Sequence, residues 1–275
     1  MDKTFFDNND DFESIVKTHL SNVTEVSLIP TGWTNYVYIA KTKDKQFIFR
    51  FPRNEFFAKA IETELDFTPL AKKRLSVGTT NLLRKSHKGR TFSMHELVDG
   101  YVLTDVLHKM TTAQIDMLAQ DFADYIYELQ NMQFSPSELQ LPTSSQFLAE
   151  LALVGDNGYD FSKLRRLGEL DEQGILTHGD FNQGNVLVDQ NFRLAAVLDY
   201  AFICWSCDIN DLARMIGRLP PKFRLPLIKA FESRLEKQIN LDDLDYLIDL
   251  WSYVDNDYIK YMKKHHPYID LSAFS

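Results

Sequence analysis

Three side chains suited to phosphoryl transfer lie within one short part of the sequence. Asp180 and Asn185 belong to the segment HGDFNQGN, residues 178–185, and Asp199 belongs to VLDY, residues 197–200. In nucleotide-dependent phosphoryl transfer, one Asp takes the proton of the acceptor hydroxyl, an Asn a few residues later holds a metal ion, and a second Asp holds Mg²⁺ on the triphosphate. The order of Asp180, Asn185 and Asp199 therefore predicts a nucleotide and magnesium site for this chemistry.

Short apolar runs around these residues explain how they could meet. The expected strands are residues 175–177, 186–188 and 194–198. A strand, a polar loop and a hairpin would return Asp199 to the neighbourhood of Asn185. The alternative is a surface loop in which the same residue types only cap turns, and we expect that simpler role for Asn182.

The two segments resemble those of the aminoglycoside and macrolide phosphotransferases, which are distant relatives of the protein kinases. The resemblance implies that Asp180 is the catalytic base, that Asn185 and Asp199 bind magnesium, and that the nucleotide is ATP or GTP. It also implies an α+β, two-lobed fold like that of a protein kinase. Residues 1–97 would form a small antiparallel-sheet lobe that binds the nucleotide, and residues 98–275 a larger, mostly helical lobe with the catalytic and acceptor sites.

A further segment and one departure belong to this resemblance. DINDLA, residues 208–213, resembles the family's DxxDLA segment, in which the second acid, here Asp211, holds the catalytic loop in place. Helix capping by Asp208 is the competing explanation of these acids. Ala201 stands where the related triplet ends in Gly, which argues against a mobile flip of that segment.

Composition limits the partners and the location. The chain has 275 residues, 44% of them hydrophobic, which is enough for a full core, and its formal net charge is -9. Because nucleic-acid phosphates are bound by clustered Lys and Arg, this charge argues against a nucleic-acid partner. The first residues lack the order of a signal peptide, and no apolar run approaches the length of a membrane span. We therefore expect a cytoplasmic protein with no membrane partner, and its oligomeric state stays open.

The N-terminal part is expected to form an antiparallel sheet. Its predicted strands are residues 23–29, 36–42 and 46–51. The loop between the first two, residues 31–35, could bind phosphate oxygens with its backbone amides. Gly32, Thr34 and Asn35 are its candidate nucleotide contacts, and an ordinary hairpin turn is the competing interpretation.

Arg50 lies inside an apolar strand, where a charged side chain needs a partner. The segment after it, residues 54–75, is predicted to be mainly helical and carries Glu62 and Glu64. A strand cation paired with a helix carboxylate orients nucleotide phosphates in kinases, and similarity to macrolide kinases favours Glu64. An outward-facing Arg50 on an edge strand is the alternative. Pro69 is expected to kink or interrupt the helix beyond Glu64.

A second hairpin, residues 82–97, is expected to end at the hinge between the lobes. By the resemblance, the adenine or guanine base would bond to backbone groups near Glu96 and Leu97. Backbone contacts of this kind carry little information about which base is bound, so ATP and GTP stay open.

The stretch 241–257 is acidic and contains no Lys or Arg. An apolar stripe runs through it, so one interpretation is an amphipathic helix with a solvated acidic face. The other is that Asp249, Asp255 or Asp257 borders the cleft and attracts an amino group of a cationic acceptor.

The leading functional hypothesis is transfer of the γ-phosphate of ATP or GTP to a hydroxyl of a small molecule. Aminoglycoside or macrolide antibiotics are the leading acceptors. A metabolic kinase for choline, homoserine or a sugar would have the same catalytic residues. A catalytically silent nucleotide-binding or regulatory module is the alternative from another class, and the intact Asp180, Asn185 and Asp199 argue against it.

Overall fold

An antiparallel sheet of order β1-β2-β3-β5-β4 forms the N-terminal part. The computed structural model describes residues 5–30, 32–134, 139–154 and 160–265, so Thr31 of the expected phosphate loop lies outside the described residues. The strands are β1 (Glu25–Ile29), β2 (Asn35–Lys41), β3 (Gln46–Pro52), β4 (Leu83–His87) and β5 (Arg90–Glu96). The predicted sheet is confirmed, with its strands within a few residues of the expected bounds.

The side chains of β3 point to two different faces of the sheet, one apolar and one that carries Arg50. Successive side chains of a strand point to opposite faces. Phe49 and Phe51 accordingly pack in the aromatic core under α1 (Phe12–His19), whereas Arg50 reaches the other side, toward α2. Because β3 pairs with both β2 and β5, Arg50 is not on an edge strand.

The helix α2 (Glu55–Arg74) begins at Asn54, whose side chain accepts a hydrogen bond from the Phe57 backbone N–H at 2.9 Å. It continues through Pro69, so the expected interruption does not occur. Phe67 and Ala71, on either side of Pro69, are fully buried. Tertiary packing of this stretch therefore outweighs the lost backbone hydrogen bond.

The C-terminal part is mostly helical. Its helices are α3 (Leu103–Val106), α4 (Thr112–Gln130), α5 (Ser144–Val154), α6 (Arg165–Asp171), α7 (Asn210–Arg218), α8 (Arg224–Leu235) and α9 (Leu241–His265). Its strands are β6 (Tyr101–Val102), β7 (Ile175–Thr177), β8 (Val186–Val188), β9 (Leu194–Val197) and β10 (Cys204–Ser206), and η3 (Tyr200–Phe202) is a 3-10 turn. β8 pairs with β9 and β6, and β7 pairs with β10. The predicted α+β architecture, a sheet followed by a helical part, is confirmed.

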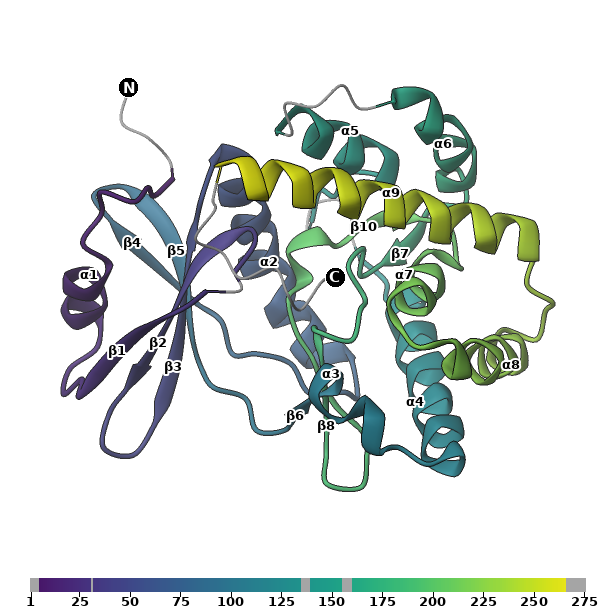
Figure 1. Ribbon diagram of the computed structural model, residues 1–275, viewed down its shortest axis with the longest axis horizontal. Helices are drawn as coiled ribbons and strands as arrows, with labels where there is room; N and C mark the ends of the chain where they lie inside the picture. Colours follow the sequence, from purple (N-terminus) through teal and green to yellow (C-terminus); the bar gives the residue numbers. More distant parts are fainter. Residues whose placement is uncertain (1–4, 31, 135–138, 155–159, 266–275) are drawn as a thin grey trace.

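α9 connects the two parts of the molecule. Figure 1 shows this helix, in yellow, running from beside α8 toward the end of the sheet. Near its far end, the Tyr258 ring lies 5.6 Å from the Trp33 ring, and the Tyr258 hydroxyl donates to the Trp33 carbonyl at 3.4 Å. None of the helices in the described ranges combines the length and apolar character that a bilayer crossing requires.

Candidate active site

Most of the predicted site residues line one cleft between the sheet and the helical part. Its volume is about 500 Å³. The predicted residues that line it are Gly32, Thr34, Asn35, Arg50, Asp180, Asn185, Asp199 and Asp255. Glu64 lies behind Arg50, while Glu96, Leu97, Asp249 and Asp257 are not among the lining residues. The sheet face, the catalytic hairpins and α9 thus converge on the same space.

The loop after β7 is held by one buried carboxylate. The backbone N–H groups of His178 and Gly179 donate to Asp211 at 2.8 and 3.0 Å. Gly179 adopts φ +76°, and a Cβ at this position would lie 2.0 Å from the Phe202 carbonyl oxygen. Only glycine fits there. Burial raises the pKa of the Asp211 carboxyl, which the two N–H donors oppose. The predicted role of Asp211 as the residue that holds this loop agrees with these contacts.

The Asp180 carboxylate is fixed by four hydrogen bonds. Oδ1 accepts from Asn182 Nδ2 at 2.9 Å, from Arg214 Nε at 2.9 Å and from Arg214 Nη2 at 2.7 Å. Oδ2 accepts from Asn185 Nδ2 at 3.0 Å. Each carboxylate oxygen has about two lone-pair sites, so Oδ1 is saturated and Oδ2 retains capacity for one more donor. Oδ2 is therefore the atom available to an acceptor hydroxyl.

Asn182 also has the predicted turn role. Its Oδ1 accepts from the Gly184 N–H at 2.8 Å, and its carbonyl accepts from the Asn185 N–H at 3.0 Å. The hydrogen bond to Asp180 is an additional function that the sequence did not indicate.

Arg50 holds two carboxylates at once. Its Nη1 donates to Glu64 Oε1 and Oε2 at 2.9 and 2.7 Å, and its Nη2 donates to Asp199 Oδ1 at 2.8 Å. The predicted contact with Glu64 is present. Burial raises the pKa of the Glu64 carboxyl, and the Arg50 guanidinium opposes that rise. Glu62, the other candidate, forms an ion pair with Arg84 on the surface.

Asn185 and Asp199 offer ligands that suit Mg²⁺. The Leu198 N–H donates to the Asn185 carbonyl at 2.9 Å, which places the two segments side by side. Because Asn185 Nδ2 bonds to Asp180, its amide oxygen is turned away from that carboxylate. Asp199, with φ 63° and ψ 64°, adopts a left-handed conformation that is unusual for a non-glycine residue. Carboxylate and amide oxygens are hard ligands of the kind that Mg²⁺ takes.

The turn at Gly32 is tightly built. A Cβ on Gly32 would lie 2.5 Å from the Asn35 carbonyl oxygen, so a larger residue would displace the turn. Asn35 Nδ2 donates to Thr34 Oγ1 at 2.7 Å. The Asn35 side-chain oxygen is buried and has no hydrogen-bond partner among the described residues. A buried unpaired oxygen at a cleft wall suits a ligand donor.

The two expected hinge residues are engaged elsewhere. The Leu97 N–H donates to the Gln46 carbonyl at 2.8 Å, and the Glu96 carboxylate pairs with Lys45 at 2.6 Å. His95 Nδ1 lies 2.9 Å from the Glu96 carbonyl oxygen. Their expected contact with the nucleotide base stays a prediction.

The acidic residues of α9 have separate environments. Asp249 is exposed. Asp255 lines the cleft, but its Oδ2 accepts from Arg214 Nη1 at 2.6 Å and pairs with Arg218 Nη2 at 2.5 Å. Reasoning from sequence missed both arginines. Their spacing of four along α7, directly after the DxxDLA segment, places them on one helix face and was a usable signal.

An aromatic wall borders the same cleft. We use this name for Trp33, Phe57, Phe147, Phe202, Trp251 and Tyr258. Phe57 and Phe147 come from α2 and α5, and the Phe147 and Phe202 rings lie 4.5 Å apart. The wall gives the cleft a largely apolar surface next to the Asp180 carboxylate.

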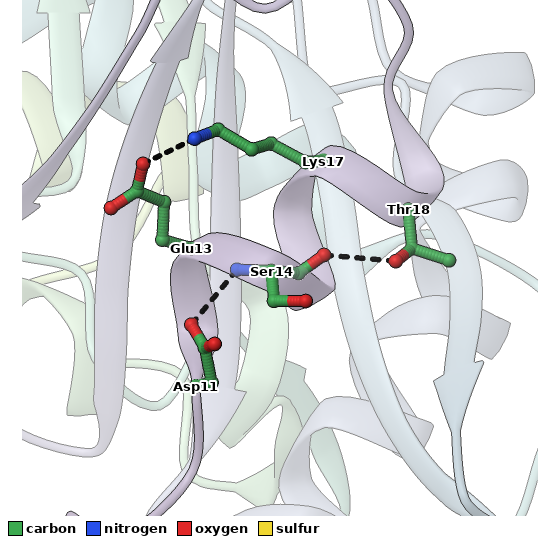
Figure 2. Close-up of a pocket in the computed structure, with 5 residues that line it drawn as sticks. All are labelled: Asp11, Glu13, Ser14, Lys17 and Thr18. Atoms are coloured by element: carbon green, nitrogen blue, oxygen red, sulfur yellow. Dashed lines mark hydrogen bonds and ion pairs between the residues drawn. The ribbon is translucent and has the colours of Figure 1, made fainter.

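A second hollow lies on the outer surface of α1 (Figure 2). Its polar groups serve the helix itself. Asp11 accepts from the Ser14 N–H at 3.0 Å, Thr18 donates to the Ser14 carbonyl at 2.9 Å, and Lys17 pairs with Glu13. This hollow therefore has the character of a helix surface and not of a binding site.

Comparison with known proteins agrees with the geometry. A model of the phosphotransferase enzyme family matches residues 25–246, which is most of the chain. The chain belongs to this family. It is therefore a phosphotransferase, and the resemblance noted in the catalytic segments is confirmed. A search of curated protein sequences gives no match.

Solved structures similar to this phosphotransferase include enzymes named for two classes of antibiotic, the aminoglycosides and the macrolides. The GDP complex of aminoglycoside 2'-phosphotransferase-IIIa has a TM-score of 0.69 and 17% identity, covering 96% of this chain and 95% of that chain. The ADP-bound aminoglycoside phosphotransferase APH(2'')-Ib has a TM-score of 0.64 and 14% identity, covering 94% of this chain and 93% of that chain. The apoenzyme of macrolide 2'-phosphotransferase MphH from Brachybacterium faecium has a TM-score of 0.60 and 13% identity, covering 96% and 97%. At these identities the similarity shows the fold.

Proposed function

We propose that this phosphotransferase moves the γ-phosphate of ATP or GTP to a hydroxyl group of a small molecule. The observation that carries the proposal is the convergence of Asp180, Asn185, Asp199 and Arg50 on one cleft. These are the side-chain types that position and neutralise a triphosphate and accept a proton from a hydroxyl. Similar structures hold GDP or ADP, which supports a nucleotide and leaves the choice of base open.

Each residue has a specific role in this proposal. Asp180 Oδ2, the oxygen with spare hydrogen-bonding capacity, accepts the proton of the acceptor hydroxyl. Asn185 and Asp199 hold Mg²⁺, which neutralises phosphate charge when it is bound. Arg50, oriented by Glu64, binds phosphate oxygens, and the turn at Gly32, Thr34 and Asn35 covers them.

We also propose the predicted division of labour between the lobes. Residues 1–97 would bind most of the nucleotide, and residues 98–275 would supply the catalytic loop and the acceptor side. Arg50 on β3 and Asp180 after β7 stand on the two sides of the cleft, which supports this division.

Aminoglycosides and macrolides are the first acceptors to test, because related structures are named for these two classes. A cationic acceptor is part of this proposal, and an amine on a largely apolar body fits the aromatic wall best. A polyamine would need several free carboxylates. Of the acids that line the cleft, Asp255 is paired with two arginines and Asp180 and Asp199 have proposed catalytic roles, which leaves Asp105. The macrolide class therefore fits the lining better than the aminoglycoside class.

A metabolic kinase for choline, homoserine or a sugar is the second candidate within the same chemistry. A silent nucleotide-binding module is the candidate from another class. It would leave the hydrogen-bonded Asp180 without a catalytic use.

An acceptor panel tests these candidates. Purified protein would be incubated with ATP or GTP and Mg²⁺ and with macrolides, aminoglycosides, choline, homoserine or sugars, and phosphorylated product would be measured by mass spectrometry. Asp180→Asn, which keeps the shape of the side chain, serves as the control, and we expect turnover to fall about 10³-fold or more with nucleotide affinity retained. Nucleotide binding without transfer to any acceptor would favour the silent module, and normal turnover by Asp180→Asn would contradict the assigned base.

A further inference from the structure

A buried chain of charges connects α9 to the Asp180 carboxylate. Arg214 donates to Asp180 through Nε and Nη2 at 2.9 and 2.7 Å, and to Asp255 Oδ2 through Nη1 at 2.6 Å. Its side chain is 8% exposed, and that of Asp255 is 13% exposed. Arg218, one turn further along α7, meets the same Asp255 oxygen at 2.5 Å. Two carboxylates from distant segments therefore share one guanidinium.

The Arg214 guanidinium is held on its flat face as well. It lies 4.7 Å from the centre of the Trp251 ring, within the range of a cation–π contact. The Trp251 ring is fixed in turn, because its Nε1 donates to Asn210 Oδ1 at 3.1 Å. Asp255 at one end and Trp251 on one face leave the guanidinium a single orientation, in which the Nε and Nη2 edge meets Asp180.

The contact fixes the plane of the Asp180 carboxylate and so the direction of its free lone pair. Three of the four donors to this carboxylate converge on Oδ1, and two of the three come from Arg214. Without them only the Asn182 and Asn185 amides would hold the carboxylate, and its plane could turn about the Cβ–Cγ bond away from the acceptor hydroxyl. A displacement of a reacting group by about 1 Å can lower the rate of the chemical step roughly 10²-fold.

We propose that Arg214 is the positioning residue of the catalytic base, and that Asp255 acts on the reaction by holding Arg214. This inference rests on the proposed function, because it concerns the geometry of the proton-accepting Asp180. It gives the acidic Asp255 an internal role in place of direct attraction of a cationic acceptor. The orientation of Asp180 affects proton transfer after the substrates have bound, so its loss should lower kcat and leave KM nearly unchanged.

Variants of Arg214 and Asp255 test this role. We expect Arg214→Gln to lower kcat about 100-fold and Asp255→Asn about 10-fold, with the KM values for nucleotide and acceptor within about threefold of the wild type. Arg214→Lys restores one hydrogen bond of the fork and should recover part of the loss. The double variant should lose less than the product of the single losses, because both residues act through one contact. Added guanidinium ion, at a concentration that does not denature, should raise the turnover of Arg214→Gln and not of the wild type.

Asp245→Asn is the matched control, since it makes the same substitution on α9 at an exposed carboxylate that pairs with Arg224. Thermal unfolding and nucleotide affinity report whether each variant is folded. If Arg214→Gln does not fold, Arg214→Lys and Asp255→Asn carry the test.

Two outcomes overturn the inference. In the first, Asp255→Asn changes kcat no more than Asp245→Asn does. In the second, Asp255→Asn raises only the acceptor KM, in a salt-dependent manner, which would make Asp255 a direct acceptor contact. A wild type that transfers phosphate to no acceptor in the panel contradicts the proposed function instead, so the two failures are distinguishable.

Discussion

Arg50 shows how one residue can connect a sheet, a helix and the catalytic half of the molecule. Its guanidinium has five N–H donors in a planar fork, and two of its nitrogens are in contact with Glu64 and Asp199. A lysine at this position could not hold both carboxylates in one plane. Arg at this position therefore has a geometric consequence that Lys would not have, because the fork links the helix carboxylate to the proposed metal ligand.

The Arg50 and Glu64 contact predicts coupled effects. We expect Arg50→Gln and Glu64→Gln each to lower kcat/KM, and the double variant to lose less than the sum, with a coupling free energy of about 1–3 kcal/mol. Arg50→Gln should lower kcat/KM more than Glu64→Gln does, because it also removes the hydrogen bond to Asp199. Glu62→Gln is the control on the same helix, where the carboxylate pairs with Arg84 on the surface. Strictly additive losses in a double-mutant cycle would show that the two residues act independently.

Asp199 allows a test by metal removal. Asp199→Asn keeps the side-chain shape, and Asn tolerates the left-handed backbone at φ 63°. We expect the variant to bind nucleotide about 10–100-fold more weakly than the wild type in the presence of Mg²⁺, as for other losses at metal sites. After chelation by EDTA, the two proteins should bind nucleotide alike in calorimetric titrations. Equal wild-type affinity with and without Mg²⁺ would contradict the assignment.

His95 predicts a pH-dependent stability. Burial lowers the pKa of this side chain to about 4, from 6.5 in an exposed histidine. Between these values the unfolded chain binds the proton and the folded chain does not, so the free energy of unfolding falls as the pH falls from about 6.5 to about 4. The lost stability is about 3 kcal/mol.

Denaturant titrations at several pH values measure this effect. The free energy of unfolding of His95→Gln should depend less on pH than that of the wild type over this interval, because the variant lacks the group that titrates. His108→Gln, at an exposed position, should follow the wild type. Parallel curves for the wild type and His95→Gln would contradict the prediction.

At the scale of elements, the catalytic loop is shaped by what surrounds it. β7 leads into the loop, Asp211 at the start of α7 accepts its backbone N–H groups, and η3 presses against Gly179. The loop therefore depends on two elements that follow it in the sequence.

A pair of glycines separates backbone conformation from crowding. Gly179 and Gly89 both have φ +76°, but a Cβ on Gly89 would meet no atom within 4 Å, whereas one on Gly179 would overlap the Phe202 carbonyl. Gly89→Ala should therefore cost about 1 kcal/mol of stability for the left-handed backbone alone. Gly179→Ala should cost about 3 kcal/mol or more and also lower kcat, since it displaces Asp180. Thermal melts and rates would contradict this if the two variants behaved alike.

The acidity of α9 has an explanation in other elements. Asp243 pairs with Arg166 of α6, Asp245 with Arg224 of α8, and Asp255 with Arg214 and Arg218 of α7. Three of the six acids in the stretch 241–257 are thus paired with arginines of other helices. That matching could not be predicted, because the sequence does not state which helices lie beside one another.

The parts of the site that could be predicted are those with local spacing. Asp180, Asn185 and Asp199 follow one another through one loop and one short hairpin, so a strand pattern and a turn were sufficient to bring them together. The Arg50 and Glu64 pair could also be predicted from the sequence, because β3 and α2 follow one another directly in the chain. The contact of Arg214 with Asp180 spans the DxxDLA segment and a helix whose packing was unknown. The interruption expected as one of two outcomes at Pro69 does not occur, because tertiary burial around it keeps α2 continuous.

At the scale of the whole molecule, polar and aromatic contacts join the N-terminal part, residues 5–97, to the helical part, and three of them serve as examples. They are Arg50 to Asp199 at 2.8 Å, the Trp33 and Tyr258 rings at 5.6 Å, and the Phe67 and Tyr200 rings at 5.1 Å. One is polar and two are aromatic, so both electrostatics and apolar packing set the distance between the parts. The aromatic wall is itself assembled from both parts.

The contact between α9 and Trp33 also bears on the order in which the chain folds. Tyr258 and Trp33 are separated by 225 positions in the sequence, and contacts between such distant residues form late because a long loop must first be closed. During synthesis from the N-terminus, the sheet and the catalytic hairpins are available before α9 exists. The orientation of Asp180 through Arg214 and Asp255 then waits for α9. Maturation of the active site is thus tied to the synthesis and docking of α9.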